Sequence, residues 1–311
     1  MKQRRIDQFN LWPMTLASDA EEKFKTRLVN TELSELFFPY KLPDTNDRHL
    51  HVCVSYMLDA LDSLPLRPDH AFDWIWRSFE YLTSHAIGGK GNLTNELRST
   101  VCPAVDGLFS SDQDISDAFF ELTNKIPFQT CEYLLKRICE SGPYSFTTGQ
   151  QNPLSSYAKR LLFSNGNPPV VSTSLQSILE FLSKNYDYKK ASDRRNGASL
   201  LRRIIKLEKV SLHSTVVQLT KSEILFFLVS GLGYAFRNDR AHAKSIAPFR
   251  SSAASITTYA HCWFMFLLFY NMTFSLLHTP SSPLVLTGPL AINFRKNHAS
   301  YSQLFGDYIN A

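Results

Sequence analysis

Glycine and proline are scarce in this chain, with 12 and 15 among 311 residues, which excludes a collagen-like or low-complexity protein. Charge is also nearly balanced: the net charge of +5 suits a polyanionic partner but does not require one. Hydrophobic residues make up 44% of the chain and aromatic residues 13%. This composition can bury a substantial core, so we expect one large or two modest folded domains.

Cysteine is sparse and unpaired in the sequence. The five cysteines stand at positions 53, 102, 131, 139 and 262, and no CxxC pair occurs. An odd number without short spacings argues against a disulfide framework or a structural zinc site. We therefore expect reduced, mostly buried thiols in a cytoplasmic protein, with no metal and no other cofactor.

Only one long apolar run is present, at residues 258–277. It is long enough to cross a bilayer. However, His261 and Asn271 interrupt it, and a helix that is apolar all round is usually a core helix or a subunit interface. The first 13 residues lack the apolar core of a secretory signal. We expect no membrane partner, with a spanning helix as the less favoured alternative.

Helical spacing dominates the chain and strand-like alternation is rare, which predicts an all-α fold. Asp69 is a candidate N-cap for the helix that follows residues 49–64. Ser251 or Ser252 is a candidate N-cap for the long apolar helix that ends near His278. A polar stretch at 142–153 and a loop at 165–169 place a boundary in the region 142–170. We expect a helical N-terminal lobe of unknown role, residues 1–150, and a helical bundle, residues 151–311. The clearest helical segments are 49–64, 116–141 with a restart at Pro127, 154–164, 172–187, 196–212, 221–240 and the apolar segment ending near His278.

One hexapeptide carries a chemical pattern: Arg237-Asn238-Asp239-Arg240-Ala241-His242. A guanidinium can hold a phosphate, and an imidazole can move protons near neutral pH. Five positions along an ideal helix correspond to a rotation of roughly 500°, so the two side chains would point about 140° apart. They can converge only where the helix ends or distorts, and we expect the helix to end here.

Chance is a competing explanation of this pattern. With 17 Arg and 9 His in the chain, one Arg-x4-His match is about an even bet, and this is the only one present. Requiring Asn directly after the Arg lowers the chance to roughly a few in a hundred. A helical segment before the hexapeptide and the apolar segment after it make coincidence less favoured still.

The hexapeptide resembles the R-x4-6-H motif of the HEPN superfamily, in the form with a polar residue after the arginine. The resemblance extends over roughly residues 170–280 and includes Gly233 to His242, the segment Pro248-Phe249-Arg250-Ser251-Ser252 and the long aromatic helix. It implies a HEPN-like helical bundle in the C-terminal half, a two-fold homodimer with a composite active site, and metal-independent endoribonuclease activity. Such proteins act in prokaryotic defence and toxin systems, which implies an antitoxin or a defence-complex partner.

Carried over by position, Arg237 and His242 take the catalytic places and Asn238 the polar position that supports them. His242 would act as general base or acid, and Arg237 would stabilise charge on the phosphate. Arg240, Lys244 and Arg250 are candidate RNA-binding residues, each with an alternative interpretation as a surface charge. Members silenced by a nucleotidyltransferase antitoxin carry Tyr where this chain has Lys244, so the chain departs from that pattern.

Three functions remain open from the sequence. The leading one is an endoribonuclease that attacks through the 2′-hydroxyl and leaves 2′,3′-cyclic phosphate and 5′-hydroxyl ends. The second is a non-catalytic HEPN-type module that binds RNA, nucleotide or a partner protein in a larger complex. The third is a structural helical adaptor in which the charges of the hexapeptide form ion pairs. His261, on the apolar segment, is expected to be a core histidine with a hydrogen-bond partner.

Overall fold

A computed structural model describes residues 2–14, 17–33, 35–86, 92–147, 155–163, 172–213, 215–244, 246–278 and 284–310. These residues are mostly helical, which confirms the all-α class. Much of the expected boundary at 142–170 lies outside the described residues. The helices of the first half of the chain are α1 (Lys2–Asn10), α2 (Asp19–Asn30), α3 (Arg48–Asp62), α4 (Pro68–Tyr81), α5 (Leu93–Glu96), α6 (Cys102–Ser111), α7 (Gln113–Thr123) and α8 (Phe128–Glu140).

The second half continues with helices and one short hairpin. Helix α12 passes into a π-helical segment, η4 (Phe227–Gly233), before the helix that carries the hexapeptide. The remaining elements are α9 (Ser156–Leu162), α10 (Thr173–Asn185), α11 (Ala191–Ile205), β1 (Val210–Leu212), β2 (Thr215–Val217), α12 (Lys221–Phe226), α13 (Tyr234–Ala241), the 3-10 turn η5 (Pro248–Arg250), α14 (Ile256–Leu277) and α15 (Thr287–Ile309).

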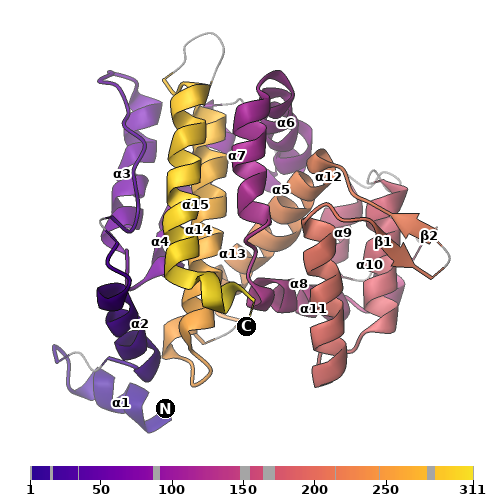
Figure 1. The fold of residues 1–311 in the computed structure, drawn as a ribbon, viewed down its shortest axis with the longest axis horizontal. Helices are drawn as coiled ribbons and strands as arrows, with labels where there is room; N and C mark the ends of the chain where they lie inside the picture. Colours follow the sequence, from indigo (N-terminus) through magenta and orange to yellow (C-terminus); the bar gives the residue numbers. More distant parts are fainter. Residues whose placement is uncertain are drawn as a thin grey trace.

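Helix α14 is the centre of the fold. It packs against α4 on one side and α15 on another, and it also contacts α2, α6, α7 and α8 (Figure 1). Apolar and aromatic residues make up most of this helix, and its most hydrophobic 18-residue window is wholly buried. A helix long enough to span a membrane but covered on every side is typical of the core of a soluble protein. The expectation of a core helix over 258–277 is confirmed.

The hydrophobic core draws on both sides of the expected boundary. One contiguous cluster of buried side chains includes members from Ala20 to Ile309, and α4 from the first half of the chain packs directly against α14 from the second half. Phe72 and Phe79 of α4 both contact the ring of Phe269 on α14 edge-on, with ring centroids 5.6 and 5.1 Å apart. Edge-to-face aromatic pairs stabilise a fold beyond the contribution from burying their apolar surface. This packing places α4 beside the hexapeptide helix.

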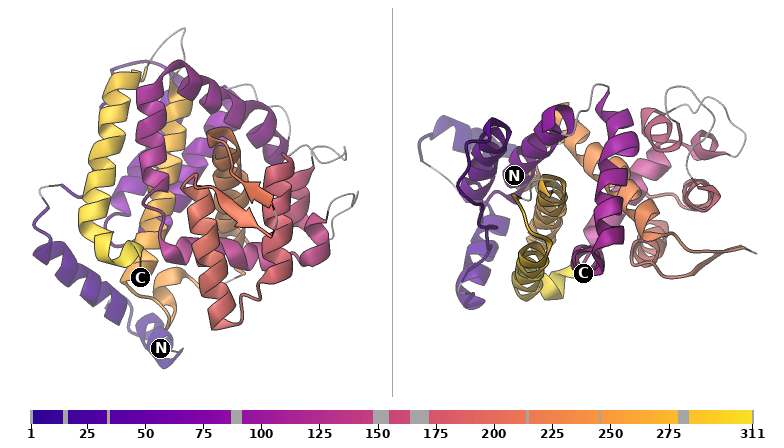
Figure 2. Two further views of the ribbon diagram at one scale, coloured as in Figure 1. Left: turned by 45° about the vertical axis from the view of Figure 1, so that its right-hand side comes forward. Right: turned by 90° about the horizontal axis from the view of Figure 1, so that it is seen from above.

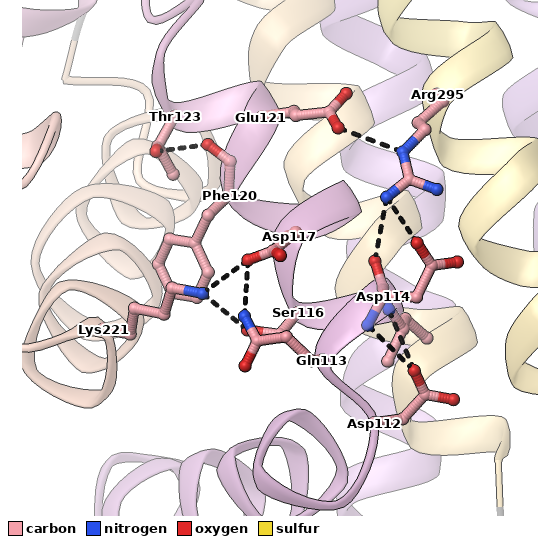
Figure 3. A network of polar contacts seen from close by, with 11 residues as sticks. Asp112, Gln113, Asp114, Ser116, Asp117, Phe120, Glu121, Thr123, Lys221 and Arg295 are labelled. Atoms are coloured by element: carbon pink, nitrogen blue, oxygen red, sulfur yellow. Dashed lines mark hydrogen bonds and ion pairs between the residues drawn. The ribbon is translucent and has the colours of Figure 1, made fainter.

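Helix α7 is joined to two later helices by exposed ion pairs (Figure 3). Lys221, at the start of α12, donates to Asp117 at 2.8 Å and to Ser116 at 3.0 Å. Arg295, on α15, donates to Glu121 at 3.0 Å and to Asp114 at 2.7 Å. Pairs exposed this much contribute little each. The buried face of α7 therefore does most of the stabilisation, and the ion pairs help to fix its orientation.

Several expected boundaries were wrong. The segment 196–212 ends as a strand, because α11 stops at Ile205 and Leu207 adopts a left-handed conformation with φ 62°. After that point Val210 and Leu212 alternate with an exposed Ser211, a period of two that suits a strand. This hairpin projects at the edge of the molecule beside α10 and α11 (Figure 2). The tail from 284, whose character the sequence left open, forms a long helix, α15.

Two expected helix caps were also placed incorrectly. Ser255, rather than Ser251 or Ser252, begins α14 and forms a capping box with Thr258. Helix α4 begins at Pro68, so Asp69 lies in its first turn and is fully buried. Asp69 binds arginine side chains instead of capping the helix, as described below. The five cysteines are free and four are buried, as expected, and burial raises the pKa of Cys53 to about 11.

Candidate functional site

The hexapeptide lies at the C-terminal end of α13. The helix ends at Ala241, and His242 is its C-cap residue. Ala243 follows with φ 48°; its N–H donates to the Arg240 carbonyl at 3.2 Å, and the N–H of Lys244 donates to the Asp239 carbonyl at 3.0 Å. This pair of bonds is a Schellman motif, with alanine in the left-handed position that usually holds glycine. The expectation that the helix ends at the motif is confirmed.

Gly233 allows the start of α13 to lie close to the core helix. A Cβ atom added at this position would lie 2.1 Å from two atoms of the Phe269 ring on α14. No side chain fits at that distance. The π-helical turn that precedes α13 brings this glycine to the contact, and π-helical segments often occur near functional sites. The position of the hexapeptide therefore depends on a backbone-to-ring contact.

Arg237 points into a cavity of about 530 Å³ between α4 and α13. Its Nη2 donates to Glu80 Oε1 at 3.4 Å, and its Nη1 donates to Asn238 Oδ1 at 3.2 Å. The Arg237 side chain is 31% exposed and that of Glu80 34%. Trp76 Nε1 donates to the other oxygen of Glu80 at 3.2 Å, which orients the carboxylate. Arg237 is thus accessible to solvent and held by a long, partly exposed ion pair.

Arg240 is held by α4. Its Nε donates to Asp73 Oδ1 at 2.6 Å, its Nη2 donates to the other oxygen of Asp73, and its Nη1 lies 3.3 Å from Asp69 Oδ2. Burial alone would lower the pKa of Arg240, but the bonds and charges of Asp73 and Asp69 raise it above the ordinary value. For Asp69, burial would raise the pKa, yet Arg67 and Arg240 lower it. In this arrangement Arg240 anchors the motif helix to α4.

Asp239 anchors the opposite side of α13 to α8. Its carboxylate is largely buried and accepts hydrogen bonds from the Tyr133 hydroxyl at 2.9 Å and from Arg137 Nη1 at 3.0 Å. Burial and the charge of Asp239 raise the pKa of the Tyr133 hydroxyl, so it stays protonated and donates. The middle of the hexapeptide, Asp239 and Arg240, therefore fixes the helix, and its two ends remain available.

His242 and Lys244 are exposed at the end of the motif helix. The backbone N–H of His242 donates to the Asn238 carbonyl at 3.0 Å, but within the described ranges its ring makes no hydrogen bond. Over the same residues no hydrogen bond joins Arg237 to His242. The cavity is lined by Arg237, Ala241 and Ala243, the last two being the neighbours of His242. Arg237 and His242 lie at the same helix end without touching.

Arg250 lies in the turn η5, after the motif. Its Nη1 donates to Gln8 Oε1 at 3.1 Å, and its carbonyl accepts from Arg5 Nη1 at 2.9 Å. Both partners belong to α1. Pro248, the first residue of this turn, lines the cavity at Arg237. Arg250 is therefore half-buried against the N-terminal helix, which lies next to the site.

Four residues of α4 that line the cavity were not recognised from the sequence as site residues: Asp73, Trp76, Arg77 and Glu80. Three of them, Asp73, Arg77 and Glu80, follow the i, i+4, i+7 spacing of one helix face. A charged stripe of this kind is usually a solvated surface, so the signal in the sequence was too weak to identify them. These four residues line the cavity only because α4 packs beside α13.

His261 lies in the core, as expected. It is 5% exposed, and its Nδ1 lies 2.8 Å from the Thr130 hydroxyl. Burial lowers its pKa to about 4, so the ring is neutral at physiological pH. Tyr259 is also fully buried, stacked on Phe24 with ring centroids 3.9 Å apart. Neither side chain reaches the solvent near the motif.

Comparisons with protein-family models, with curated proteins and with solved structures find no match to this chain. The function must therefore be argued from the residues and the geometry of the site. That site consists of an exposed imidazole, a solvent-accessible guanidinium and a charged cavity, held between α4 and α8 by partly buried ion pairs.

Proposed function

We propose that this protein is a metal-independent endoribonuclease of the HEPN type, acting in the cytoplasm as an anti-phage defence or toxin effector. The observation that supports it best is the exposure of both ends of the hexapeptide while its middle is fixed. Arg237 reaches a solvent-accessible cavity and His242 is exposed, whereas Asp239 is held by an ion pair with Arg137 and Arg240 by an ion pair with Asp73. A rigid helix end that presents two functional groups to solvent suits catalysis.

In the proposed reaction, the neutral ring of His242 accepts the proton of the RNA 2′-hydroxyl. The 2′-oxygen forms a bond to the adjacent phosphorus, and the bond from phosphorus to the 5′-oxygen breaks. A second imidazole, from the partner copy in a composite site, donates a proton to the leaving 5′-oxygen. Arg237 stabilises the charge that develops on the phosphate oxygens, and Asn238 orients Arg237 through their hydrogen bond. DNA lacks the nucleophile and is not cleaved by this route.

The homodimer in this proposal needs an interface near the motif, and α1 offers one. Exposed apolar side chains gather at residues 6–14: Phe9 is 84% exposed and Trp12 79%. Helix α1 is bonded to the turn at Arg250, which is continuous with the cavity through Pro248. Clustered exposed apolar side chains are typical of an interaction surface. A second copy bound here would lie beside the turn η5, whose Pro248 lines the same cavity as Ala241 and Ala243.

The decisive experiment incubates the purified protein with a short end-labelled RNA in EDTA and identifies the product ends. We expect 2′,3′-cyclic phosphate and 5′-hydroxyl ends from the wild-type chain, and no product from Arg237→Ala or His242→Ala. The His242→Ala variant is informative because the exposed ring makes no hydrogen bond within the described residues, so its stability should equal that of the wild type. Cleavage that requires added Mg²⁺, or that persists in both variants, rejects the proposal.

A non-catalytic HEPN-type module that binds RNA, nucleotide or a partner protein is the second candidate. One observation favours it: the Arg237 guanidinium is already paired with Glu80, and no hydrogen bond joins it to His242 among the described residues. This candidate expects that the wild-type chain binds RNA without product, and that the same two variants bind more weakly. Antitoxin or defence-complex partners would then act through the same surface.

A further inference from the structure

The cavity between α4 and α13 contains charges from both halves of the chain. Three guanidinium groups, those of Arg77, Arg237 and Arg240, and two carboxylates, those of Asp73 and Glu80, line it. A concave, charged surface of about 530 Å³ is large enough to admit part of a polynucleotide backbone rather than a lone ion. Which of these charges are neutralised inside the protein decides what the cavity can bind.

Two of the three arginines already have carboxylate partners. Arg240 is paired with Asp73 on both oxygens and lies close to Asp69. Arg237 is paired with Glu80, whose second oxygen is held by Trp76. On the face of α4, Asp73 and Glu80 flank Arg77 one turn away on either side. Both flanking carboxylates therefore form ion pairs with arginines of α13.

Arg77 is the exception. It is exposed, and across the described residues no carboxylate forms an ion pair with it; its guanidinium lies 5.0 Å from the centroid of the Trp74 ring. A cation stacked on an aromatic ring keeps its full charge and its in-plane N–H donors. An exposed guanidinium without a counter-ion, at the wall of a cavity that also holds Arg237, attracts an anion.

We propose that Arg77 binds a backbone phosphate of single-stranded RNA next to the phosphate held by Arg237. This inference rests on the proposed function, because it takes RNA as the ligand, but it assigns a binding role to the N-terminal half that the motif does not supply. Arg77 contacts a phosphate that is not cleaved, so it contributes to affinity and positioning and not to the chemical step. Glu80 keeps Arg237 aimed into the cavity and leaves Arg77 free.

The test measures binding of a labelled single-stranded RNA by fluorescence anisotropy over a range of salt concentrations. The protein carries His242→Ala so that the RNA stays intact, and Arg77→Ala is compared with Arg203→Ala in that background. Arg203 lies on α11, pairs with Glu208, and does not line the cavity. We expect Arg77→Ala to weaken binding by about tenfold at low salt and to reduce the slope of log affinity against log salt by about 0.7. Arg203→Ala should change neither.

Kinetics of the cleaving protein provide a second measurement. Arg77→Ala in the otherwise wild-type chain should raise KM and leave kcat within about twofold, because uniform binding is lost and the reacting groups are intact. Equal salt slopes for Arg77→Ala and Arg203→Ala, with cleavage present, overturn this inference and leave the proposed function standing. A reduced slope without any cleavage supports the phosphate site and rejects the nuclease. Absence of both RNA binding and cleavage overturns both.

Discussion

Arg240 on α13 and Asp73 on α4, 167 positions apart in the sequence, form a two-pronged ion pair that fixes the motif helix. Asp69, which is fully buried, lies behind this pair and shares the guanidinium of Arg240. A carboxylate without contact to water must keep its cationic partners, because an unpaired buried charge is strongly unfavourable. The charge of Arg240 is therefore needed by the fold before any question of ligand binding arises.

Replacement of Arg240 by alanine should consequently destabilise the protein. We expect Arg240→Ala to lower the free energy of unfolding by about 3 kcal/mol, because Asp69 would remain buried with Arg67 alone. Urea denaturation measures this loss. Arg203→Ala, which removes an ion pair with both partners about half exposed, should cost less than about 1 kcal/mol. An Arg240→Ala protein of wild-type stability that has lost RNA affinity would assign Arg240 to the ligand instead.

Two glycine substitutions should have opposite effects on stability. Gly233→Ala places a Cβ atom against the Phe269 ring, and we expect it to destabilise the protein by about 1–3 kcal/mol through overpacking. Gly107→Ala adds a methyl group to an exposed position in α6 with no heavy atom within 4 Å, and should stabilise by roughly 0.5–1 kcal/mol. Thermal unfolding of both variants checks the pair. A Gly233→Ala protein as stable as Gly107→Ala would mean that α13 does not lie this close to α14.

Stability should fall on mild acidification. Burial lowers the pKa of His261 to about 4 and that of His298 to about 3, so in the folded protein both rings stay neutral well below the pKa of about 6.5 that they have when unfolded. Between these limits the unfolded chain binds more protons, and the free energy of unfolding decreases as pH falls. From pH 6.5 to pH 5 the loss should be about 2 kcal/mol for each ring.

Urea denaturation at pH 7, 6 and 5 measures this dependence. His261→Gln removes one titrating ring, so the slope of unfolding free energy against pH should be smaller than that of the wild type in this window. His298 and His70, whose pKa burial also lowers, keep the remainder of the slope. Most carboxylates titrate below pH 5 and therefore contribute little to the slope in this window. A stability that stays flat from pH 7 to pH 5 would show that these rings are accessible to protons in the folded state.

The exposed apolar side chains of residues 6–14 should determine the oligomeric state. We expect Phe9→Asp and Trp12→Asp, alone or together, to convert a homodimer to monomers, because each places a charge in an apolar interface. Analytical ultracentrifugation measures the change, and RNA cleavage should fall with it if the site is composite. Val216→Asp, at an exposed position on the hairpin, is the matched control and should leave the dimer intact. A wild-type chain that is monomeric at high concentration would contradict the prediction.

The sequence by itself determined that the fold is mostly helical, that the hexapeptide ends its helix, and that residues 258–277 and His261 belong to the core. These properties depend on contacts within a few positions along the chain: the spacing of apolar residues and the break in apolar pattern after Phe236. Even here the local signal was insufficient at the hairpin, where the alternation covers only three residues.

Tertiary structure alone decided the partners of the charged residues. Nothing near Arg237, Asp239 or Arg240 in the sequence indicates Glu80, Tyr133 or Asp73, which lie more than 100 positions away. An ion pair forms between whichever opposite charges the packing of helices brings together, and that packing is set by the whole core rather than by local pattern. The cavity, the anchoring of Arg240 and the place of Arg77 at the cavity wall all follow from the packing of α4 against α13 and α14.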